Sequence, residues 1–184
     1  MEFDEIYRQY GQKVKAFILA MVRDEMTADD LLHETFIRVQ THMDRLRDKD
    51  KWSSWIFRIA CNLCRDHFRA CARNARLPVT ALEEMPSKTG TTIQERIEQE
   101  EMGRCVRQKM DRLPESYRTI LILYDVMAFH HHEIADILGI SVDNAKIRLH
   151  RARGQLKAIL EKECRFQVNE RQVLVCEPAP DAPE

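Results

Sequence analysis

The sequence predicts an all-α protein with two small helical domains joined by a flexible linker, and it allows a short β-hairpin in the C-terminal tail. Only 5 glycines and 6 prolines occur among 184 residues, so residues that interrupt helices are scarce. Apolar residues recur at three- and four-residue steps over most of the chain, which is the spacing of one buried face on a helix. The length suits one medium domain or two small domains.

The N-terminal domain is expected over residues 1–76. Its first helix is predicted by an apolar stripe formed by Phe3, Ile6, Tyr7, Tyr10, Val14, Phe17, Ile18 and Met21. Thr27 is predicted to cap the second helix, because two aspartates follow in the first turn, where the helix dipole favours acidic side chains. A polar stretch at 44–51 ends that pattern, and a third helix is predicted over 52–72.

A flexible linker is expected at residues 77–92, which contain two prolines, a glycine and several Ser and Thr residues. A C-terminal domain is expected over residues 93–163 and begins with a charged helix. Leu113-Pro114-Glu115 is predicted to break this helix and to start another, because proline suits the first position of a helix. The remaining residues, 164–184, are expected to form a tail.

A helix-turn-helix is predicted inside the C-terminal domain. Its first helix is expected over 131–138, its turn at 139–141 and its second helix over 142–156. Gly139 can adopt the left-handed conformation that the turn requires, and Ser141 can cap the second helix. The side of the second helix that faces the first is predicted to consist of Ala145, Leu149, Ala152 and Leu156.

The opposite side of this second helix is predicted to enter the major groove of DNA. Lys146 and Arg151 can donate hydrogen bonds to guanine or phosphate, and Ile147 can contact a thymine methyl group. Arg148 and Arg153 flank this side and suit phosphate contacts. The complete set of candidate DNA contacts is Asp143, Asn144, Lys146, Ile147, Arg148, His150, Arg151 and Arg153. The alternative is an ordinary helical hairpin with a basic surface.

Charge is unevenly distributed along the chain, although the formal net charge is only −1. Residues 45–76 hold nine Lys or Arg against three Asp, and residues 146–157 hold five basic residues and no acidic ones. An acidic stretch with six Glu lies between them, at 83–101. Two basic segments suggest two contacts with a polyanion, although solvated helix faces would give the same composition.

The chain shows no apolar run of the ~18 residues that a membrane span needs, and its start shows no secretory signal pattern. A cytoplasmic protein is therefore expected, with its six cysteines reduced rather than joined in a disulfide framework. Cys64, His67 and Cys71 share one side of a predicted helix, but small buried thiols are favoured over a metal site there. No metal or other cofactor is expected.

The tail predicts a hairpin, since alternating apolar residues flank the polar sequence Asn169-Glu170-Arg171. A turn centred on Glu170 would place Cys164 opposite Cys176. These two thiols are a candidate redox pair or part of a metal site, and two unrelated thiols are the alternative. The proline-rich end of the chain after Glu177 is expected to be disordered.

Several short motifs occur in the order found in one bacterial family. Residues 29–39, DDLLHETFIRV, resemble the polymerase-clamp-binding helix of sigma factors, and residues 55–63, WIFRIACNL, resemble their promoter-melting helix. Four further segments resemble parts of the sigma-factor domain that reads the minus-thirty-five element: 113–115, 133–135, 138–141 and 148–153. Together these motifs cover about residues 1–163, and the chain resembles the extracytoplasmic-function (ECF) group of bacterial sigma factors.

The resemblance implies a non-enzymatic subunit of RNA polymerase that recognises and melts promoter DNA, and it implies control by an anti-sigma partner. The residues implied to bind the polymerase clamp are Asp30, Leu31, Leu32, Glu34 and Phe36. Leu32 and Phe36 could equally be core residues. The residues implied at the minus-ten element, where a loop captures a flipped base, are Leu46, Arg47, Lys49, Trp52, Arg58, Asn62, Arg65 and Arg69.

Some residues depart from the family pattern in ways that concern DNA specificity. Leu46 stands where an aromatic residue is common, Asp48 where many members have Gly, and Asp143-Asn144 where many have Gly-Thr. Two other interpretations stay open at this point. One is a helix-turn-helix regulator that binds duplex DNA without polymerase. The other is a thiol or metal enzyme, for which no nucleophile and base are convincingly spaced.

Overall fold

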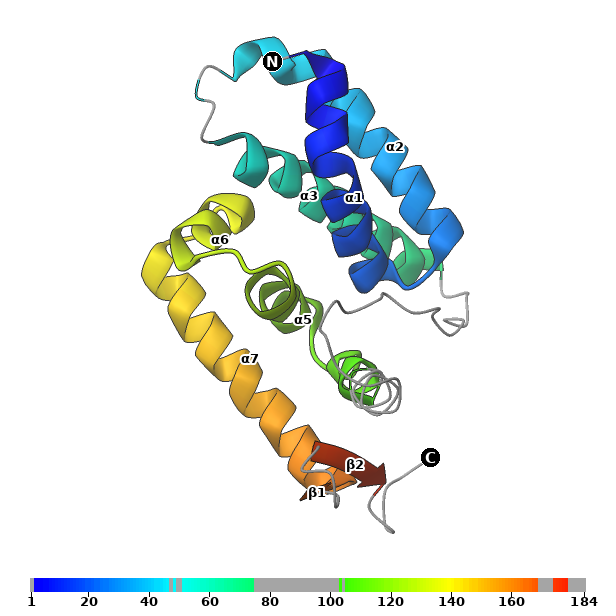
Figure 1. Cartoon of the computed structure of the whole chain (residues 1–184), viewed down its shortest axis with the longest axis vertical. Helices are drawn as coiled ribbons and strands as arrows, with labels where there is room; N and C mark the ends of the chain where they lie inside the picture. Colours follow the sequence, from blue (N-terminus) through cyan, green and yellow to red (C-terminus); the bar gives the residue numbers. More distant parts are fainter. Residues whose placement is uncertain are drawn as a thin grey trace. The chain divides into compact units, whose positions relative to one another are not determined.

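The computed structural model of the chain describes residues 2–46, 48, 51–74, 103, 105–168 and 174–178. These residues are mainly helical, as the sequence predicts, and they include one two-stranded sheet (Figure 1). They divide into two compact units. One unit takes in Met1–Glu84 and Ile122–Lys146, and the other takes in Met85–Leu121 and Ile147–Glu184.

Three long helices form the core of the first unit. α1 (Phe3–Val22), α2 (Glu25–His42) and α3 (Trp52–Asn74) pack against one another (Figure 1), and a 3-10 turn, η1 (Met43–Arg45), follows α2. Most of the apolar stripe predicted for α1 is confirmed, because five of its members are buried: Ile6, Val14, Phe17, Ile18 and Met21.

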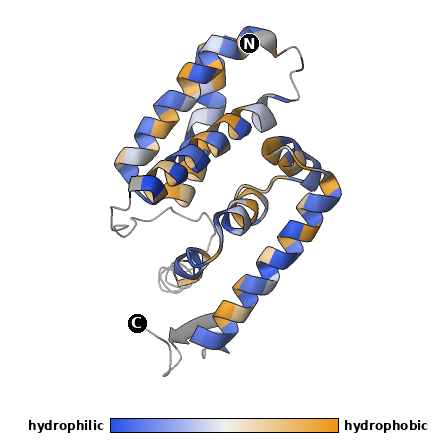
Figure 2. Cartoon of the chain, turned by 180° about the vertical axis from the view of Figure 1, so that it is seen from behind, coloured by the Kyte–Doolittle hydropathy of each residue, from blue (hydrophilic) through white to orange (hydrophobic). Residues whose placement is uncertain are grey.

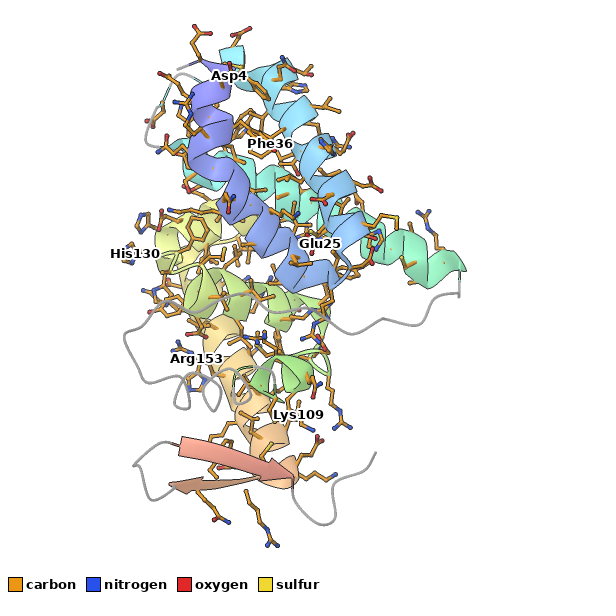
Figure 3. All side chains as sticks on the ribbon, turned by 45° about the vertical axis from the view of Figure 1, so that its right-hand side comes forward. Asp4, Glu25, Phe36, Lys109, His130 and Arg153 are labelled. Carbon is orange, nitrogen blue, oxygen red and sulfur yellow. The ribbon has the colours of Figure 1, made fainter. Side chains whose placement is uncertain are left out.

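Aromatic rings join α1 to its two neighbours. Phe36 of α2, labelled in Figure 3, lies edge-on to the ring of Tyr7 with the centroids 4.8 Å apart, although 45% of Tyr7 is exposed. The rings of Phe17 in α1 and Phe57 in α3 have centroids 5.4 Å apart, and both residues are buried. Burying one phenylalanine side chain contributes about 1.5–3 kcal/mol, so these rings are a main source of stability in this unit.

The N-terminal cap of α2 is Asp24. Its Oδ2 accepts a hydrogen bond from the backbone N–H of Thr27 at 2.7 Å, and hydrogen bonding from Thr27 lowers the pKa of the Asp24 carboxyl. The prediction that Thr27 caps this helix is therefore wrong. The helix begins earlier, at Glu25, because Asp24 already provides the acceptor that the first N–H groups need.

The first unit also contains a π-helical turn, η3 (Ile122–Val126), with α6 (His131–Leu138) and the first residues of α7 (Val142–Glu163). α6 packs against α3, and the ring centroid of Phe129, just before α6, lies 4.7 Å from that of Phe57. The sequence assigns α6 to the C-terminal domain and α3 to the N-terminal domain. This compact unit combines parts of both.

The second unit contains helical residues 105–110, α5 (Glu115–Leu121), most of α7 and the strands β1 (Cys164–Val168) and β2 (Leu174–Pro178). α5 starts directly after Pro114, as the sequence predicts for that proline. α7 continues beyond its predicted end and leads straight into β1.

The predicted hairpin is present, but its register differs from the expected one. β1 and β2 are antiparallel, with Cys164 opposite Pro178 and Phe166 opposite Cys176. The predicted pairing of Cys164 with Cys176 is therefore wrong, so the candidate redox pair of these two thiols loses the register that suggested it. Each observed pairing is shifted by two residues from the expected one.

Several predicted segments fall outside the part of the chain that the structure describes: the linker at 77–92, the start of the charged helix at 93–102, the hairpin turn at 169–171 and the end of the chain at 179–184. Pro178, expected to begin the disordered end, is instead the last residue of β2. Among the described residues, no helix combines the length and the apolar character needed to cross a membrane.

Candidate nucleic-acid interface

The turn between α6 and α7 has the geometry that its residues predict. Gly139 ends α6 in the left-handed conformation, with φ of +65°, and its N–H donates to the carbonyl of Ala135. The backbone therefore favours glycine, because a side chain is strained at this φ. A Cβ would lie 3.0 Å from Nη2 of Arg58, at the mobile end of a long side chain that can move aside. The Oγ of Ser141 accepts a hydrogen bond from the N–H of Asn144 at 3.2 Å, which confirms the predicted cap of α7.

The apolar side of α7 is buried as predicted. Ala145, Leu149 and Ala152 are each at most 3% exposed, and Leu156 is half-buried. Hydrophobic and hydrophilic residues alternate along this helix in Figure 2. Burial of one side leaves the other side of α7 open to solvent.

The candidate DNA contacts of α7 lie on its exposed side, apart from Arg148, which is half-buried. The exposed members are Asp143, Asn144, Lys146, Ile147, His150, Arg151 and Arg153. Ile147 is 51% exposed, so one aliphatic side chain stands among polar and basic groups. A surface that reads thymine methyl groups as well as hydrogen-bonding edges needs this mixture. The ion pair between Lys146 and Asp143, at 3.5 Å, is exposed and contributes little to stability.

A second basic surface runs along α3. Arg58, Asn62, Arg65 and Arg69 follow one another at steps of four, three and four residues, which places them along one side of the helix. Arg58, Asn62 and Arg69 are exposed, and Arg65 is half-buried. The Nη1 of Arg65 donates to Oδ1 of Asn62 at 3.2 Å, so the guanidinium orients the amide. The structure brings together these four residues of the predicted minus-ten set.

The remaining members of that set differ in their placement. Trp52 is only 4% exposed and packs edge-on against the ring of Trp55 at 5.6 Å. Trp52, implied above to contact the minus-ten element, is therefore placed in the core, where its ring is covered. Leu46 is half-exposed, whereas Arg47 and Lys49 lie outside the described residues.

The candidate polymerase contacts on α2 divide into a buried and an exposed group. Leu32 and Phe36 are 6% and 3% exposed, which decides in favour of core roles for both. Asp30 is exposed, and Leu31 and Glu34 are half-exposed.

Two exposed apolar residues of α2 were missed by the sequence analysis. Met26 and Ile37 are 75% and 58% exposed. Met26 precedes Asp30 by four residues and Ile37 follows it by seven, so all three share one side of the helix. The spacing of Met26, Asp30 and Ile37 could have identified this side of the helix from the sequence. Leu32 and Phe36 concealed it, because they are the apolar residues that a partner-binding helix is expected to carry, yet they face the core.

The cysteines and histidine of α3 have separate environments. Cys61 and Cys64 are buried, and the complete burial of Cys64 fits a core thiol. The Sγ of Cys71 lies 3.4 Å from Nε2 of His67. Within the described ranges, no three His, Cys, Asp or Glu residues are grouped as metal ligands would be.

Glu163, the last residue of α7, anchors that helix to residues 105–110. It is 4% exposed, and its Oε2 accepts a hydrogen bond from Nζ of Lys109 at 2.7 Å, while Oε1 accepts one from Arg112. Lys109, labelled in Figure 3, lies beside the C-terminal part of α7. The hydrogen bond from Lys109 lowers the pKa of the Glu163 carboxyl, and the same bond raises the pKa of Lys109.

Replacing Glu163 by glutamine is expected to lower the urea midpoint of unfolding at pH 7, because two cations lose their carboxylate partner. A carboxyl whose pKa is lowered by folding stabilises the protein above its unfolded pKa, here 4.5, and loses that effect as pH falls through the folded pKa. The difference between wild type and Glu163→Gln should therefore shrink below about pH 4.5. Glu161→Gln, in an exposed pair with Lys157, is the matched control. A difference that stays constant from pH 7 to pH 3 would contradict this account.

Comparison with protein families gives two matches, and each covers one of the basic surfaces. The model for Sigma-70 region 2 matches residues 6–74, which contain most of α1 and all of α2 and α3. The model for Sigma-70, region 4 matches residues 103–156, which contain the helix-turn-helix.

Similar proteins cover nearly the whole chain. The RNA polymerase sigma factor SigZ of Bacillus subtilis is 34% identical over 175 residues, which are 92% of this chain and 93% of that protein. The ECF RNA polymerase sigma factor SigM of Bacillus subtilis is 34% identical over 163 residues, or 88% of this chain and 97% of that protein. The sigma factor RpoE, solved with the anti-sigma factor NepR from Bartonella quintana, has the same fold. Its TM-score is 0.69 at 19% identity, covering 86% of this chain and 96% of RpoE.

Proposed function

The chain belongs to the sigma-70 family of RNA polymerase sigma factors, with relatives in its ECF group, and from this membership we propose which residues perform each step of promoter recognition. Members of this family are transcription initiation factors and not enzymes, so the chain acts by binding. It directs core RNA polymerase to promoters. One observation supports this assignment of residues to steps: each of the two family matches covers a helix with an exposed basic surface.

The helix-turn-helix is proposed to read the minus-thirty-five element. The exposed side of α7 would lie in the major groove, with Lys146 and Arg151 donating to bases or phosphates and Ile147 contacting thymine. Arg148 and Arg153 would hold phosphates on either side. The burial of Ala145 fixes which side of α7 faces the protein, and therefore the direction in which these side chains point.

The exposed side of α3 is proposed to bind the minus-ten element once its strands separate. Asn62 would contact a base of the single strand, since an amide offers both donors and an acceptor. Arg58, Arg65 and Arg69 would follow the phosphates. Capture of a flipped base by the loop around Leu46 stays a prediction. Binding of the separated strand by these side chains offsets the few kcal/mol that unstacking a base costs, so the protein can melt DNA without hydrolysing a nucleotide.

The exposed side of α2 is proposed to bind the polymerase clamp. Asp30 and Glu34 supply negative charge, and Met26 and Ile37 supply apolar contacts in place of the buried Leu32 and Phe36. An apolar centre with charged neighbours is the usual composition of a binding hot spot. We further propose that residues 1–76 and 93–163 act as separate domains joined through 77–92. The family matches at 6–74 and 103–156 support this division.

Location and control are proposed from the family and the chemistry. RNA polymerase works in the cytoplasm, and we place this chain there with it. We also propose an anti-sigma factor as its regulator. The observation that supports this is the shared fold with RpoE, which was solved bound to the anti-sigma factor NepR.

The polymerase contact is tested by measuring the affinity of the purified chain for core RNA polymerase. Asp30→Lys and Ile37→Glu are each expected to weaken binding about 10–30-fold, the effect of losing about 1.4–2 kcal/mol at a hot spot. Asp4→Lys makes the same charge change at an exposed residue of α1 and should leave binding unchanged.

Wild-type affinity in both α2 variants would contradict this assignment. A chain that does not bind core polymerase, but binds duplex DNA by itself in a gel-shift experiment, would instead be a helix-turn-helix regulator.

A further inference from the structure

Two cysteine sulfurs that are far apart in the sequence lie side by side in the second unit. The Sγ atoms of Cys105 and Cys164 are 3.8 Å apart. Cys105 is half-buried on the helical residues 105–110, and Cys164 is the first residue of β1 and 6% exposed. Because 59 positions separate the two residues, tertiary structure and not local geometry holds them together.

The ion pairs of Glu163 hold the same two segments together at adjacent positions. Glu163 directly precedes Cys164, and Lys109 follows Cys105 by four residues, one turn along the same helix. The 2.7 Å bond between Lys109 and Glu163, with the further bond from Arg112, therefore fixes the approach of the two thiols. Little movement is needed to bring the sulfurs from 3.8 Å to the ~2.05 Å of a disulfide bond.

The Lys109 ammonium also lies within electrostatic range of both sulfurs. The pKa of Lys109 is raised mainly by its hydrogen bond to Glu163, and to a smaller extent by the nearby Cys164 and Cys105. This site therefore combines two close sulfurs, a fixed backbone and a cation.

We propose that Cys105 and Cys164 are a modification site that forms a reversible intramolecular disulfide when the protein meets hydrogen peroxide. The more exposed Cys105 sulfur attacks one peroxide oxygen, the O–O bond breaks, and the second oxygen leaves as water. The product is a sulfenic acid at Cys105. The Cys164 sulfur then attacks the Cys105 sulfur, the S–O bond breaks, and the hydroxyl leaves as water with the Cys164 proton. Two thiols are oxidised, and one peroxide is reduced to two waters.

The bridge would tie residues 105–110 to the start of β1 covalently, across the junction that Glu163 already holds by charge. It differs from a bridge between Cys164 and Cys176, which the register of β1 and β2 does not favour. The proposal does not depend on the assignment of promoter contacts, because it rests on the two thiols and their neighbours.

The test treats the full-length reduced protein with hydrogen peroxide, blocks remaining thiols with iodoacetamide and digests with a protease that cleaves after glutamate. The resulting peptides separate the three relevant cysteines: Cys105 lies on 102–115, Cys164 on 164–170 and Cys176 on 171–184, because the protease does not cleave between Glu177 and Pro178. In Glu163→Gln the peptide with Cys164 becomes 162–170. Mass spectrometry is expected to find 102–115 linked to 164–170, two hydrogens lighter than the sum of the two peptides and separated again by dithiothreitol.

Variants identify what the linkage requires. Cys105→Ser and Cys164→Ser should each abolish it, whereas Cys71→Ser, at a half-buried thiol of α3, should leave it unchanged. Glu163→Gln should slow its formation several-fold, because the segments are held less firmly. The proposal is overturned if Cys164 links instead to Cys176, or if peroxide leaves the wild type unbridged with Cys105 as an isolated sulfinic acid. An unchanged rate in Glu163→Gln would overturn the role given to that carboxylate.

Discussion

Replacing Phe57 by alanine is expected to lower the free energy of unfolding of the first unit by about 3–5 kcal/mol. Phe57 is 1% exposed, and its ring lies between Phe17 at 5.4 Å and Phe129 at 4.7 Å. Truncation would remove both ring contacts and leave a cavity in the core. A domain has only about 5–15 kcal/mol of net stability, so this loss is a large share of it.

Urea denaturation measures this effect, with the midpoint expected to fall while the slope stays the same. Ile37→Ala is the control, because an exposed aliphatic residue should change stability by no more than about 0.5 kcal/mol. Phe129→Ala, combined with Phe57→Ala in a double-mutant cycle, should reveal a coupling of about 0.5–1.5 kcal/mol. A coupling of zero would contradict the packing of α6 on α3.

Replacing Arg151 by alanine is expected to reduce the affinity of the holoenzyme for its promoter about 5–150-fold, the equivalent of about 1–3 kcal/mol for one bidentate base contact. Arg151 is exposed on the side of α7 opposite the buried Ala145 and Leu149. Arg151→Lys keeps the positive charge but loses the planar guanidinium group, which can donate two parallel hydrogen bonds, so it should recover only part of the affinity.

The measurement is promoter affinity at one fixed salt concentration, because phosphate contacts make affinity strongly salt-dependent. Lys157→Ala is the matched control, since Lys157 is an exposed cation further along the same helix and outside the proposed contacts. If Arg151→Ala and Lys157→Ala weaken binding equally and uniformly across promoter sequences, Arg151 supplies charge and does not read bases.

The local features of the fold could be predicted because short-range periodicity and turn chemistry determine them. Gly139 and Ser141 were assigned correctly, since a left-handed turn and an open helix end each demand a particular kind of residue. The burial of Ala145, Leu149 and Ala152 followed from their spacing. Thr27 failed as a cap because two acceptable capping residues lie three positions apart, and periodicity does not choose between them.

The features that depend on distant contacts could not be predicted. Trp52 was assigned to DNA, yet its burial depends on how the whole of α3 is rotated against the core. The hairpin register differs from the predicted one by two residues, because alternation along the strands determines which residues share a face but not which residues pair. The contact between Cys105 and Cys164 has no sequence signal, since it requires the end of α7 to meet residues 105–110.

The most direct test of the account is transcription from a genomic promoter library by core RNA polymerase with and without the purified chain. New start sites should appear only when the chain is present, and they should share two upstream elements at a fixed spacing. Asn62→Ala should weaken initiation at these sites. The absence of any new start site, from a chain shown to be folded and bound to core polymerase, would contradict the central claim that this protein directs polymerase to promoters.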